Sequence, residues 1–518
     1  MAKKVAVIAI GGNSLIKDKN HQSVQSQYLA ADETARHIVE MIKEGWEVVI
    51  GHGNGPQVGF LLQKAEIAEK VANLALAPLE VCGAQSQGQI GYQLIQCLQN
   101  EMIKAGVNKP AAAVIEQTVV SKDDPAFQNP TKPIGGFMTE KEAKLKEKEL
   151  GWTVVEDAGR GWRRVVPSPL PERIVELDAI KALIDAGIIV VSVGGGGIPV
   201  IEHEDGTLEG VAAVIDKDFG NSLLAQNLKA DVLVISTAVE KVAINFGKPD
   251  QQWLDHMTLE EAKKYMEEGV HFKKGSMAPL EVCGAQSQGQ IGYQLVQCLQ
   301  NEMKKAGVNK SAACVIEQTV VNKNDPAFQN PSKPIGGFMT EEEAKIKERD
   351  LGWTVVEDAG RGWRRVVPSP LPERIVELDA IKALIDAGII VVSVGGGGIP
   401  VVEDENGKLS GIAAVIDKDF GNSLLAQNLN ADVLVISTAV EKVAINFGKP
   451  DQQWLDHMTL EEAKAYMAEG IHFKKGSMAP KIQAIINFLE AGGKEAIITN
   501  PENILRAIHG ETGTRITK

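Results

Sequence analysis

Residues Leu79–Gly83 read LEVCG, and the same letters return at Leu280–Gly284, an offset of 280 − 79 = 201 positions. The match continues without a gap, so that Leu79–Pro279 aligns with Leu280–Pro480, and most of the differences are conservative. A period of this length is far too long for the repeating unit of a solenoid. The sequence therefore indicates that one large block has been duplicated in tandem.

Segments that occur only once flank the duplicated block. We call residues 1–78 the head, 79–279 copy one, 280–480 copy two and 481–518 the tail. Removing either copy leaves 518 − 201 = 317 residues with an uninterrupted pattern, and the dipeptide Ala-Pro stands at each edge of the block. The simplest interpretation is a shorter ancestral protein whose middle was duplicated.

The composition bounds the class of protein. The chain has 518 residues, of which 44% are hydrophobic and 24% charged, and this is enough to bury more than one core. Its formal net charge of −14 repels nucleic acid and anionic membranes, which we exclude as partners. No run of about 18 apolar residues is present, and the cysteines form no CxxC pair. We expect free thiols and a cytoplasmic location.

Apolar segments with strand character alternate with segments of helical spacing. Val5–Ile10, Trp46–Ile50 and Ile188–Val193 have the apolar composition of buried strands, and Ala30–Lys43 has the spacing of an amphipathic helix. This alternation predicts an α/β fold in which helices cover both faces of a mainly parallel sheet, a three-layer αβα sandwich. Ligands bind such sheets beyond the carboxyl ends of the strands.

A stretch within each copy is too irregular for the main sheet. Residues 118–171 and 319–372 are rich in proline, lysine and aspartate, and we predict that each forms a protruding lobe. Lys132 and Lys333 lie there between prolines, which stiffen the chain and suit a lysine on a lid. A solvated loop lysine is an equally good interpretation.

Two glycine loops follow strands in the head. Gly11-Gly12-Asn13 and Gly53-Asn54-Gly55 allow the backbone to approach an anion closely, and a following helix adds a favourable dipole. One such loop is often only a turn, but two of them, each with an asparagine, favour an oxyanion site. The sequence has no GxxxxGK[ST] loop and no dinucleotide fingerprint, which excludes P-loop kinases and Rossmann enzymes.

Lysines at strand ends supply the positive charge that phosphoryl transfer requires. Lys217 and Lys418 each stand between two aspartates where a strand passes into a helix, although an ion-paired surface turn has the same pattern. A further lysine, Lys481, follows Ala-Pro at the end of copy two, whereas Leu280 stands at the matching joint of copy one. If the lysine after Ala-Pro is catalytic, Lys481 alone can serve.

These motifs resemble those of carbamate kinase, in the amino-acid kinase family. The resemblance covers the whole chain once the duplication is allowed for, and it rests on 9–13, 52–57, 82–88, 159–169, 194–199, 216–218 and 476–478. It implies reversible phosphoryl transfer between ATP and carbamate, giving carbamoyl phosphate and ADP with magnesium. In that family the reaction usually runs toward ATP, in arginine or other carbamoyl catabolism.

The resemblance also implies roles for individual residues. The residues expected to cradle carbamate and the transferred phosphoryl group are Gly11, Gly12, Asn13, Gly53, Asn54 and Gly55. The residues expected at the nucleotide are Ser236, Thr237 and Val239, or Ser437, Thr438 and Val440. No residue is assigned to a metal.

The expected catalytic residues are charged. Lys132 or Lys333 would close over the phosphoryl group, and Lys217 or Lys418 would contact its oxygens. Asp218 or Asp419 would hold the lysines in place, and Lys481 would stabilise the bridging and leaving oxygens. No general base is needed, because carbamate is already an anionic nucleophile.

Several alternatives stay open from the sequence. The duplicated chain is either an active kinase or an impaired pseudoenzyme that binds nucleotide without turnover. Acetylglutamate, uridylate and aspartate kinases share the expected fold. Either copy, or a split between the two, could join the head and the tail. The assembly is expected to be a homodimer or an intrachain pseudo-dimer of the duplicated region.

Overall fold

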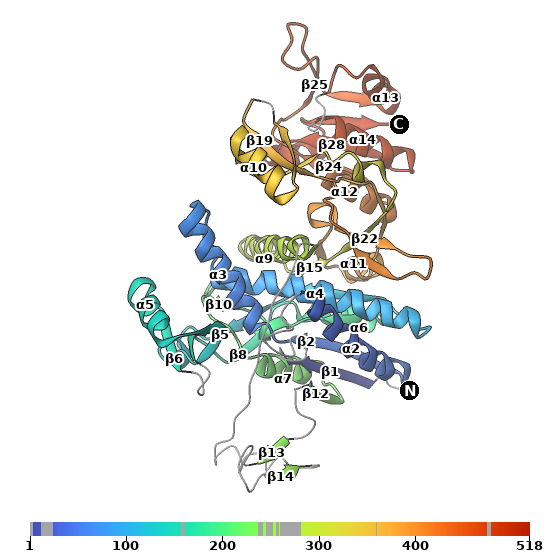
Figure 1. Cartoon of the computed structure of the whole chain (residues 1–518). Coiled ribbons are helices and arrows are strands. Elements are labelled where there is room, and N and C mark those ends of the chain that lie inside the picture. The colour runs from blue at the N-terminus through green and yellow to red at the C-terminus, as the bar shows by residue number, and fades with distance from the viewer. Residues whose placement is uncertain are drawn as a thin grey trace. The chain divides into compact units, whose positions relative to one another are not determined.

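The chain divides into two compact units (Figure 1). The computed structural model describes residues 4–11, 24–156, 161–236, 242–244, 252–254, 258, 281–358, 360–473 and 478–518. Unit 1 comprises Met1–Ile316 and Ala383–Val392, and unit 2 comprises Glu317–Lys382 and Ser393–Lys518. The division between the units therefore falls inside copy two.

Unit 1 is built on a seven-stranded sheet in the order β12-β1-β2-β9-β3-β15-β21. Its strands are β1 (Lys4–Ile10), β2 (Trp46–His52), β3 (Ala111–Ile115), β9 (Ile189–Val191), β12 (Val232–Ser236), β15 (Ala312–Ile316) and β21 (Ile390–Val392). All neighbours are parallel except β3 and β15. The prediction of a mainly parallel sheet is confirmed.

Helices cover both faces of this sheet. The helices that pack on it include α2 (Val24–Lys43), α4 (Leu79–Lys104), α6 (Leu177–Asp185), α7 (Lys217–Leu228) and α9 (Glu281–Lys305). Gly91 of α4 lies against Ala113, and Gly51 lies against Asn221 of α7. Val191 of β9 pairs with Ile50 of β2 and with Ala113 of β3, so Ile50 and Ala113 face the same side of the sheet. Gly51 follows Ile50 in its strand and therefore faces the opposite side from Ala113. Helices α4 and α7 are therefore the two outer layers of the predicted αβα sandwich.

The predicted lobe forms a small sheet of its own in the order β5-β7-β6. Its elements are β5 (Lys132–Met138), α5 (Glu140–Leu150), β6 (Thr153–Glu156) and β7 (Trp162–Val166). A capping box between Thr139 and Glu142 starts α5, and Gly151 ends the helix in the left-handed conformation. Helix α3 (Gly55–Ala72) packs against β5 and connects the lobe to the head.

Shorter elements complete unit 1. A second sheet, in the order β11-β10-β4-β8, consists of β4 (Gln117–Val120), β8 (Pro171–Ile174), β10 (Ile198–Glu202) and β11 (Leu208–Gly210). The remaining elements are the 3-10 turns η1 (Pro125–Phe127) and η2 (Gly194–Gly196) and the paired strands β13 (Val242–Ile244) and β14 (Gln252–Leu254). The sequence also predicts a helix at about 259–268, and this segment lies outside the described residues.

Unit 2 repeats the same succession with the sequence of copy two. Its strands are β16 (Gln318–Val321), β17 (Lys333–Met339), β18 (Thr354–Glu357), β19 (Trp363–Val367), β20 (Pro372–Ile375), β22 (Ile399–Glu403), β23 (Leu409–Gly411), β24 (Val433–Ser437), β25 (Val443–Ile445), β26 (Gln453–Leu455) and β27 (His457–Thr459). Its helices are η3 (Pro326–Phe328), α10 (Glu341–Leu351), η4 (Gly395–Gly397), α12 (Lys418–Asn428) and α13 (Leu460–Glu469). Helix α11 (Leu378–Asp386) spans the division between the units.

The tail joins copy two. Its elements are α14 (Met478–Glu490), β28 (Glu495–Thr499), η5 (Pro501–Asn503), α15 (Ile504–Ile508) and β29 (Thr514–Thr517). Strand β28 pairs with β24 in parallel, and α14 packs on α12 through a core that includes Ile482 and Ile485. The head strand β1 pairs with β12 of copy one. Each single-copy segment has thus joined the copy that is its neighbour in the sequence.

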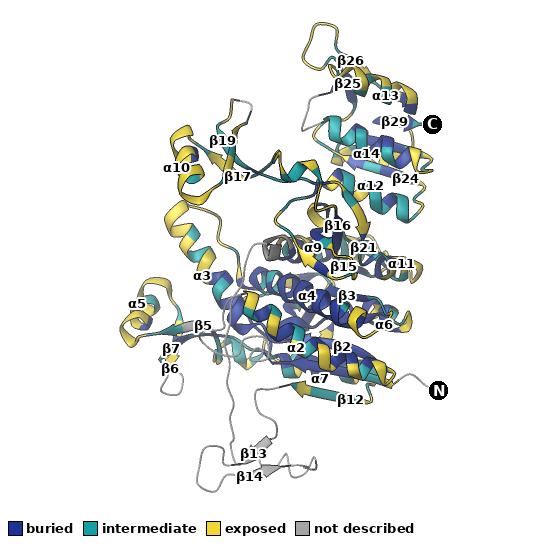
Figure 2. Ribbon diagram, turned by 45° about the vertical axis from the view of Figure 1, so that its right-hand side comes forward, coloured by how far each residue is buried: buried dark blue, intermediate teal, exposed yellow. Residues whose placement is uncertain are grey.

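Within unit 1, the two copies meet along what we call the α4–α9 seam, formed by α4, α9, β3 and β15 (Figure 2). The amide of Gln85 donates to Gln290 at 2.6 Å, and the amide of Gln286 donates to Gln89 at 2.7 Å. Since 286 and 290 are the repeat positions of 85 and 89, the two bonds are related by a pseudo-twofold. Strands β3 and β15 obey the same symmetry, because Val114 pairs with its own counterpart, Val315.

Candidate active site

The two glycine loops of the head lie side by side in unit 1. The N–H of Gly53 donates to the Ile10 carbonyl at 2.9 Å, and the N–H of Gly11 donates to the Ser236 carbonyl at 3.0 Å. Both amides are therefore occupied by the sheet and do not point at a ligand. The first turn of α3, which begins at Gly55, carries amides that have no partner within the helix. This helix start, with Asn54 at its N-cap, is the better place for an anion.

Buried polar side chains fix the second loop. Asn54 is 5% exposed, and its amide donates to Ser86 at 2.7 Å. A side chain at Gly195 would lie 2.1 Å from the Asn54 amide, and one at Gly194 would lie 2.5 Å from the His52 ring. Only glycine fits at this turn, since Gly195 also has a φ of +67°. The Gly194–Gly197 turn and the head loop form one packed wall.

The lobe lysine of each copy reaches the aspartate that caps a helix. Lys132 forms an ion pair with Asp216, which caps α7 by accepting the N–H of Asp218 at 2.9 Å. In unit 2 the corresponding pair, Lys333 and Asp417, is 2.5 Å apart. Burial would raise the pKa of Asp417, but hydrogen bonds from Lys333 and from the backbone hold this pKa below its ordinary value.

The second aspartate of each motif differs between the copies. Asp419 receives Lys418 at 2.7 Å and Lys481 at 2.8 Å, and its side chain is 7% exposed. Asp218 forms an ion pair with Lys217, and its side chain is 45% exposed. The tail therefore gives unit 2 a buried carboxylate that holds two lysines together, an arrangement suited to an anionic group.

In each copy a strand of the sheet follows the Asp-Lys-Asp motif. The residues expected at the nucleotide begin at the end of this strand. Ser236 ends β12 and Ser437 ends β24. The N–H of Thr438 donates to the Thr499 carbonyl at 2.8 Å, which joins this loop to the tail, and Val440 follows two residues later. Four of the expected site residues, Gly12, Asn13, Thr237 and Val239, lie outside the described residues.

The structure brings the expected residues together in two groups. The group in unit 1 is Gly11, Gly53, Asn54, Gly55, Lys132, Lys217, Asp218 and Ser236, and the group in unit 2 is Lys333, Lys418, Asp419, Ser437, Thr438, Val440 and Lys481. Unit 1 has the head loops, and Lys481 belongs to unit 2. Each group has a lobe lysine and an Asp-Lys-Asp motif.

Two residues of this wall are absent from the sequence-based prediction. The amide of Gln87 donates to the carbonyls of Gly194 at 2.9 Å and of Glu116 at 3.1 Å, and so it fixes α4 to the glycine turn. Glu116 is wholly buried and accepts a hydrogen bond from Thr118 at 2.6 Å. Burial, and then the charge of Glu176, raise the pKa of Glu116 well above its ordinary value. Gln87 lies within the 82–88 motif of the resemblance, where no role was expected for it, and no motif contains Glu116.

The donor set does not form a metal cage. Across the described ranges, no group of three or more histidine, cysteine, aspartate or glutamate side chains could hold a metal ion. The carboxylates of the two motifs are instead paired with lysines. Mg²⁺ usually keeps several waters and binds through one or two carboxylates together with substrate phosphates. The described residues therefore fit magnesium only as the companion of a nucleotide.

Comparison with known proteins identifies the class. The sequence model of the amino acid kinase family matches residues 4–286 and again 289–500. The chain therefore belongs to the amino acid kinase family.

Its curated relatives are carbamate kinases. "Carbamate kinase" of Thermococcus kodakarensis is 52% identical over 277 residues, which cover 53% of this chain and 87% of the relative. "Carbamate kinase-like protein YqeA" of Escherichia coli is 48% identical over 320 residues, 61% of this chain and all of the relative. The solved structure of Giardia carbamate kinase is 25% identical with a TM-score of 0.41, and the alignment covers 100% of both chains.

No helix in the described part of the chain is long and apolar enough to cross a membrane.

Proposed function

We propose that this chain is a carbamate kinase, which transfers a phosphoryl group between ATP and carbamate and yields carbamoyl phosphate and ADP. The observation that carries the proposal is the cluster of Lys418, Asp419 and Lys481, in which one buried carboxylate orients two ammonium groups. The identity of about half of all aligned positions to carbamate kinases supports the same substrate class.

The reaction requires positioning and positive charge. Carbamate is already an anionic nucleophile, so the protein has to hold it in line with the phosphoryl group and neutralise the charge that develops. Within unit 1 we assign the first task to Asn54 and the start of α3, and within unit 2 we assign the second task to Lys418 and Lys481. The lobe lysine closes over the phosphoryl group. Magnesium would enter with the nucleotide and would neutralise charge on its phosphates.

An acceptor panel tests the proposal. Purified full-length chain is given carbamoyl phosphate and ADP, and ATP formation is followed. In the opposite direction, ATP consumption is compared for carbamate, acetylglutamate, uridylate and aspartate. We expect turnover with the carbamoyl pair alone. Nucleotide binding without turnover of any acceptor would contradict the proposal and would point to the pseudoenzyme.

We further propose that the duplicated region is an intrachain pseudo-dimer. The α4–α9 seam has the self-complementary pattern of an interface between two copies of one subunit, since the Gln85–Gln290 bond is repeated as Gln286–Gln89 and Val114 pairs with Val315. The α4 face is then covered within the chain and is closed to a partner chain. The glycines Gly88 and Gly289 lie at the crossing point, where any side chain would collide with the opposite helix.

A cytoplasmic location is also part of this proposal. The described cysteines whose state is defined, Cys82, Cys97, Cys298 and Cys314, are all free thiols. Burial raises the pKa of Cys82 and of Cys314 to about 12, so these two thiols are unreactive. Free thiols of this kind are typical of a reducing compartment.

A further inference from the structure

Identical side chains have different exposures in the two copies. The side chain of Lys217 is 8% exposed in unit 1, whereas that of Lys418, its counterpart, is 56% exposed in unit 2. Asn221 is wholly buried, and its counterpart Asn422 is exposed. The sequence around these residues is the same in both copies, so the difference comes from what covers them.

In unit 1 the head covers this face. Strand β1 pairs along β12 from Ala6 opposite Val232 to Ile10 opposite Ser236, and α7 packs against β1. Gly51, on the neighbouring head strand, lies directly against the Asn221 side chain. The head thus supplies both the strand that pairs with β12 and the surface that buries α7.

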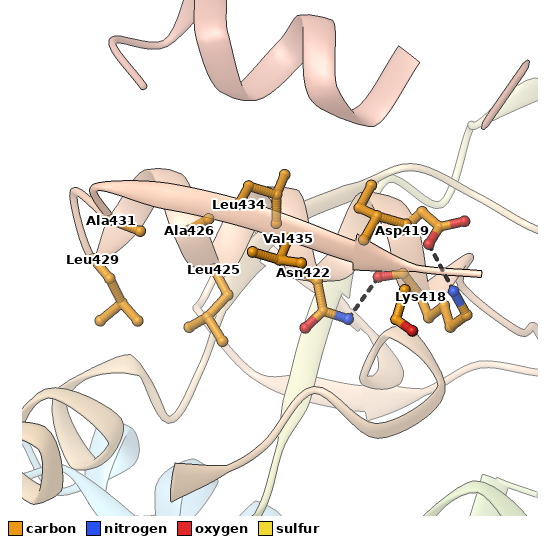
Figure 3. Close-up of a pocket in the computed structure, with 11 residues that line it drawn as sticks. Lys418, Asp419, Asn422, Leu425, Ala426, Leu429, Ala431, Leu434 and Val435 are labelled. Atoms are coloured by element: carbon orange, nitrogen blue, oxygen red, sulfur yellow. Dashed lines mark hydrogen bonds and ion pairs between the residues drawn. The ribbon is translucent and has the colours of Figure 1, made fainter. Parts of the chain in front are cut away.

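In unit 2 the corresponding face is an open groove (Figure 3). Among the described strands, β24 has one partner, β28, and it forms an edge of its sheet. The groove has a volume of about 360 Å³, and it runs between α12 and β24 with Lys418 and Asp419 at one end. Its apolar floor includes Leu425, Leu429, Leu434 and Val435.

We propose that this groove binds strand β1, Lys4–Ile10, from the head of a second copy of this chain. The lining residues of the groove have identical counterparts in unit 1, where β1 pairs with β12 and packs against α7: Leu224, Leu228, Leu233 and Val234 recur as Leu425, Leu429, Leu434 and Val435. Each chain has one head and two such faces. Its own β1 is already buried between β12 and β2, so another chain must supply the second strand.

At β24 the strand would meet the same side chains as at β12, and it would give up its pairing with β2. Docking of β1 covers the free edge of β24, whose other edge is already paired with β28, and opens the edge of β12 in the chain that supplies the strand. The repeat offset fixes the register: Val7, which pairs with Leu233 in unit 1, would pair with Leu434. A consequence that rests on the proposed function is that the head loops would join the group containing Lys481.

Disulfide trapping tests this docking without any enzyme assay. A tagged full-length chain carries Leu434→Cys and an untagged full-length chain carries Val7→Cys, both in a Cys298→Ser background that removes the exposed thiol. The chains are unfolded together, refolded and oxidised, because β1 must leave its own sheet to exchange. Paired strands lie about 4.8 Å apart, which is within the Cα range of a disulfide.

We expect an interchain disulfide whose yield is several times that of a control pair with the cysteine at Ser410, an exposed position of β23. Blocking the groove with Asn422→Trp should abolish the product, and Asn428→Trp, on the same helix outside the groove, should leave it unchanged. Equal yields at 434 and 410 would overturn the proposal. So would a disulfide that forms within a single chain carrying both Val7→Cys and Leu434→Cys at high dilution, since the chain's own head would then be the occupant.

An absence of ATP formation leaves this result unaffected. If the disulfide forms and the chain has no activity with carbamoyl phosphate, the docking stands and the proposed function fails. If activity is present and no interchain disulfide forms, the proposed function stands and the docking proposal fails.

Discussion

At the scale of single residues, the aspartates of the two Asp-Lys-Asp motifs determine where the lysine ammonium groups lie. The sequence predicted Lys217 and Lys418 where a strand passes into a helix and Lys481 at the start of a tail helix, but it did not indicate which carboxylate each would meet. The structure gives Asp419 two lysines and leaves Asp218 half exposed with one. Sequence spacing could not reveal this difference, since the lysine that distinguishes the two motifs comes from the tail.

This difference predicts unequal effects of one substitution. Asp419→Asn should reduce ATP formation from carbamoyl phosphate and ADP more strongly than Asp218→Asn, because it releases both Lys418 and Lys481. Steady-state kinetics of the two variants measures the contrast. A larger loss for Asp218→Asn would mean that the copy-one motif is the catalytic one.

The buried carboxyl of Glu116 predicts a pH dependence of stability. Burial raises the pKa of this group, so as the pH rises above the ordinary value the unfolded chain releases the proton and the folded chain keeps it. The stability contribution of Glu116 is therefore present at low pH and is lost as the pH rises through the folded pKa. Glu116→Gln should flatten the fall of Tm with pH, whereas Glu204→Gln, at an exposed position, should not. Parallel curves for wild type and Glu116→Gln would contradict this assignment.

At the scale of elements, the alternation of strands and helices was predictable, and the partners of those elements were not. The apolar runs Val5–Ile10, Trp46–Ile50 and Ile188–Val193 placed β1, β2 and β9 to within two residues at each end, and the irregular composition placed the separate lobe. From the sequence we expect the helix of the Asp-Lys-Asp motif to begin near Phe219, but α7 begins two residues earlier, because the capping role of Asp216 shows only in its hydrogen bond. Which copy takes the head could not be predicted, because the faces that receive it have the same residues.

The seam predicts opposite effects for two glycines of one helix. A methyl group at Gly88 would lie 2.2 Å from the Ala285 carbonyl, and one at Gly83 meets nothing within 4 Å. Gly88→Ala should therefore destabilise unit 1 by about 1–3 kcal/mol. Gly83→Ala should stabilise it by up to about 1 kcal/mol through helix propensity. Thermal unfolding measures the change in Tm for both variants. Equal changes in Tm would show that α4 and α9 do not pack closely.

At the scale of the whole molecule, the duplication divides the parts of one kinase between two units. A chain lacking 280–480 restores the order head, copy one, tail, and its α4 face has lost α9. We expect this 317-residue variant to associate in pairs through that face, and Gly88→Trp to prevent the association. Light scattering measures the mass of both. If the 317-residue variant is monomeric at all concentrations, the pseudo-dimer interpretation of the seam is contradicted.

The most direct test of the central claim is the rate of ATP formation from carbamoyl phosphate and ADP by the full-length chain and by Lys481→Ala. Lys494→Ala is the matched control, since Lys494 is a tail lysine exposed to solvent and paired with Asp432. We expect an active parent, a loss of roughly 10²–10³-fold for Lys481→Ala, because a charge-stabilising donor is removed, and no change for Lys494→Ala. An inactive parent, or a Lys481→Ala variant as fast as the parent, would contradict it.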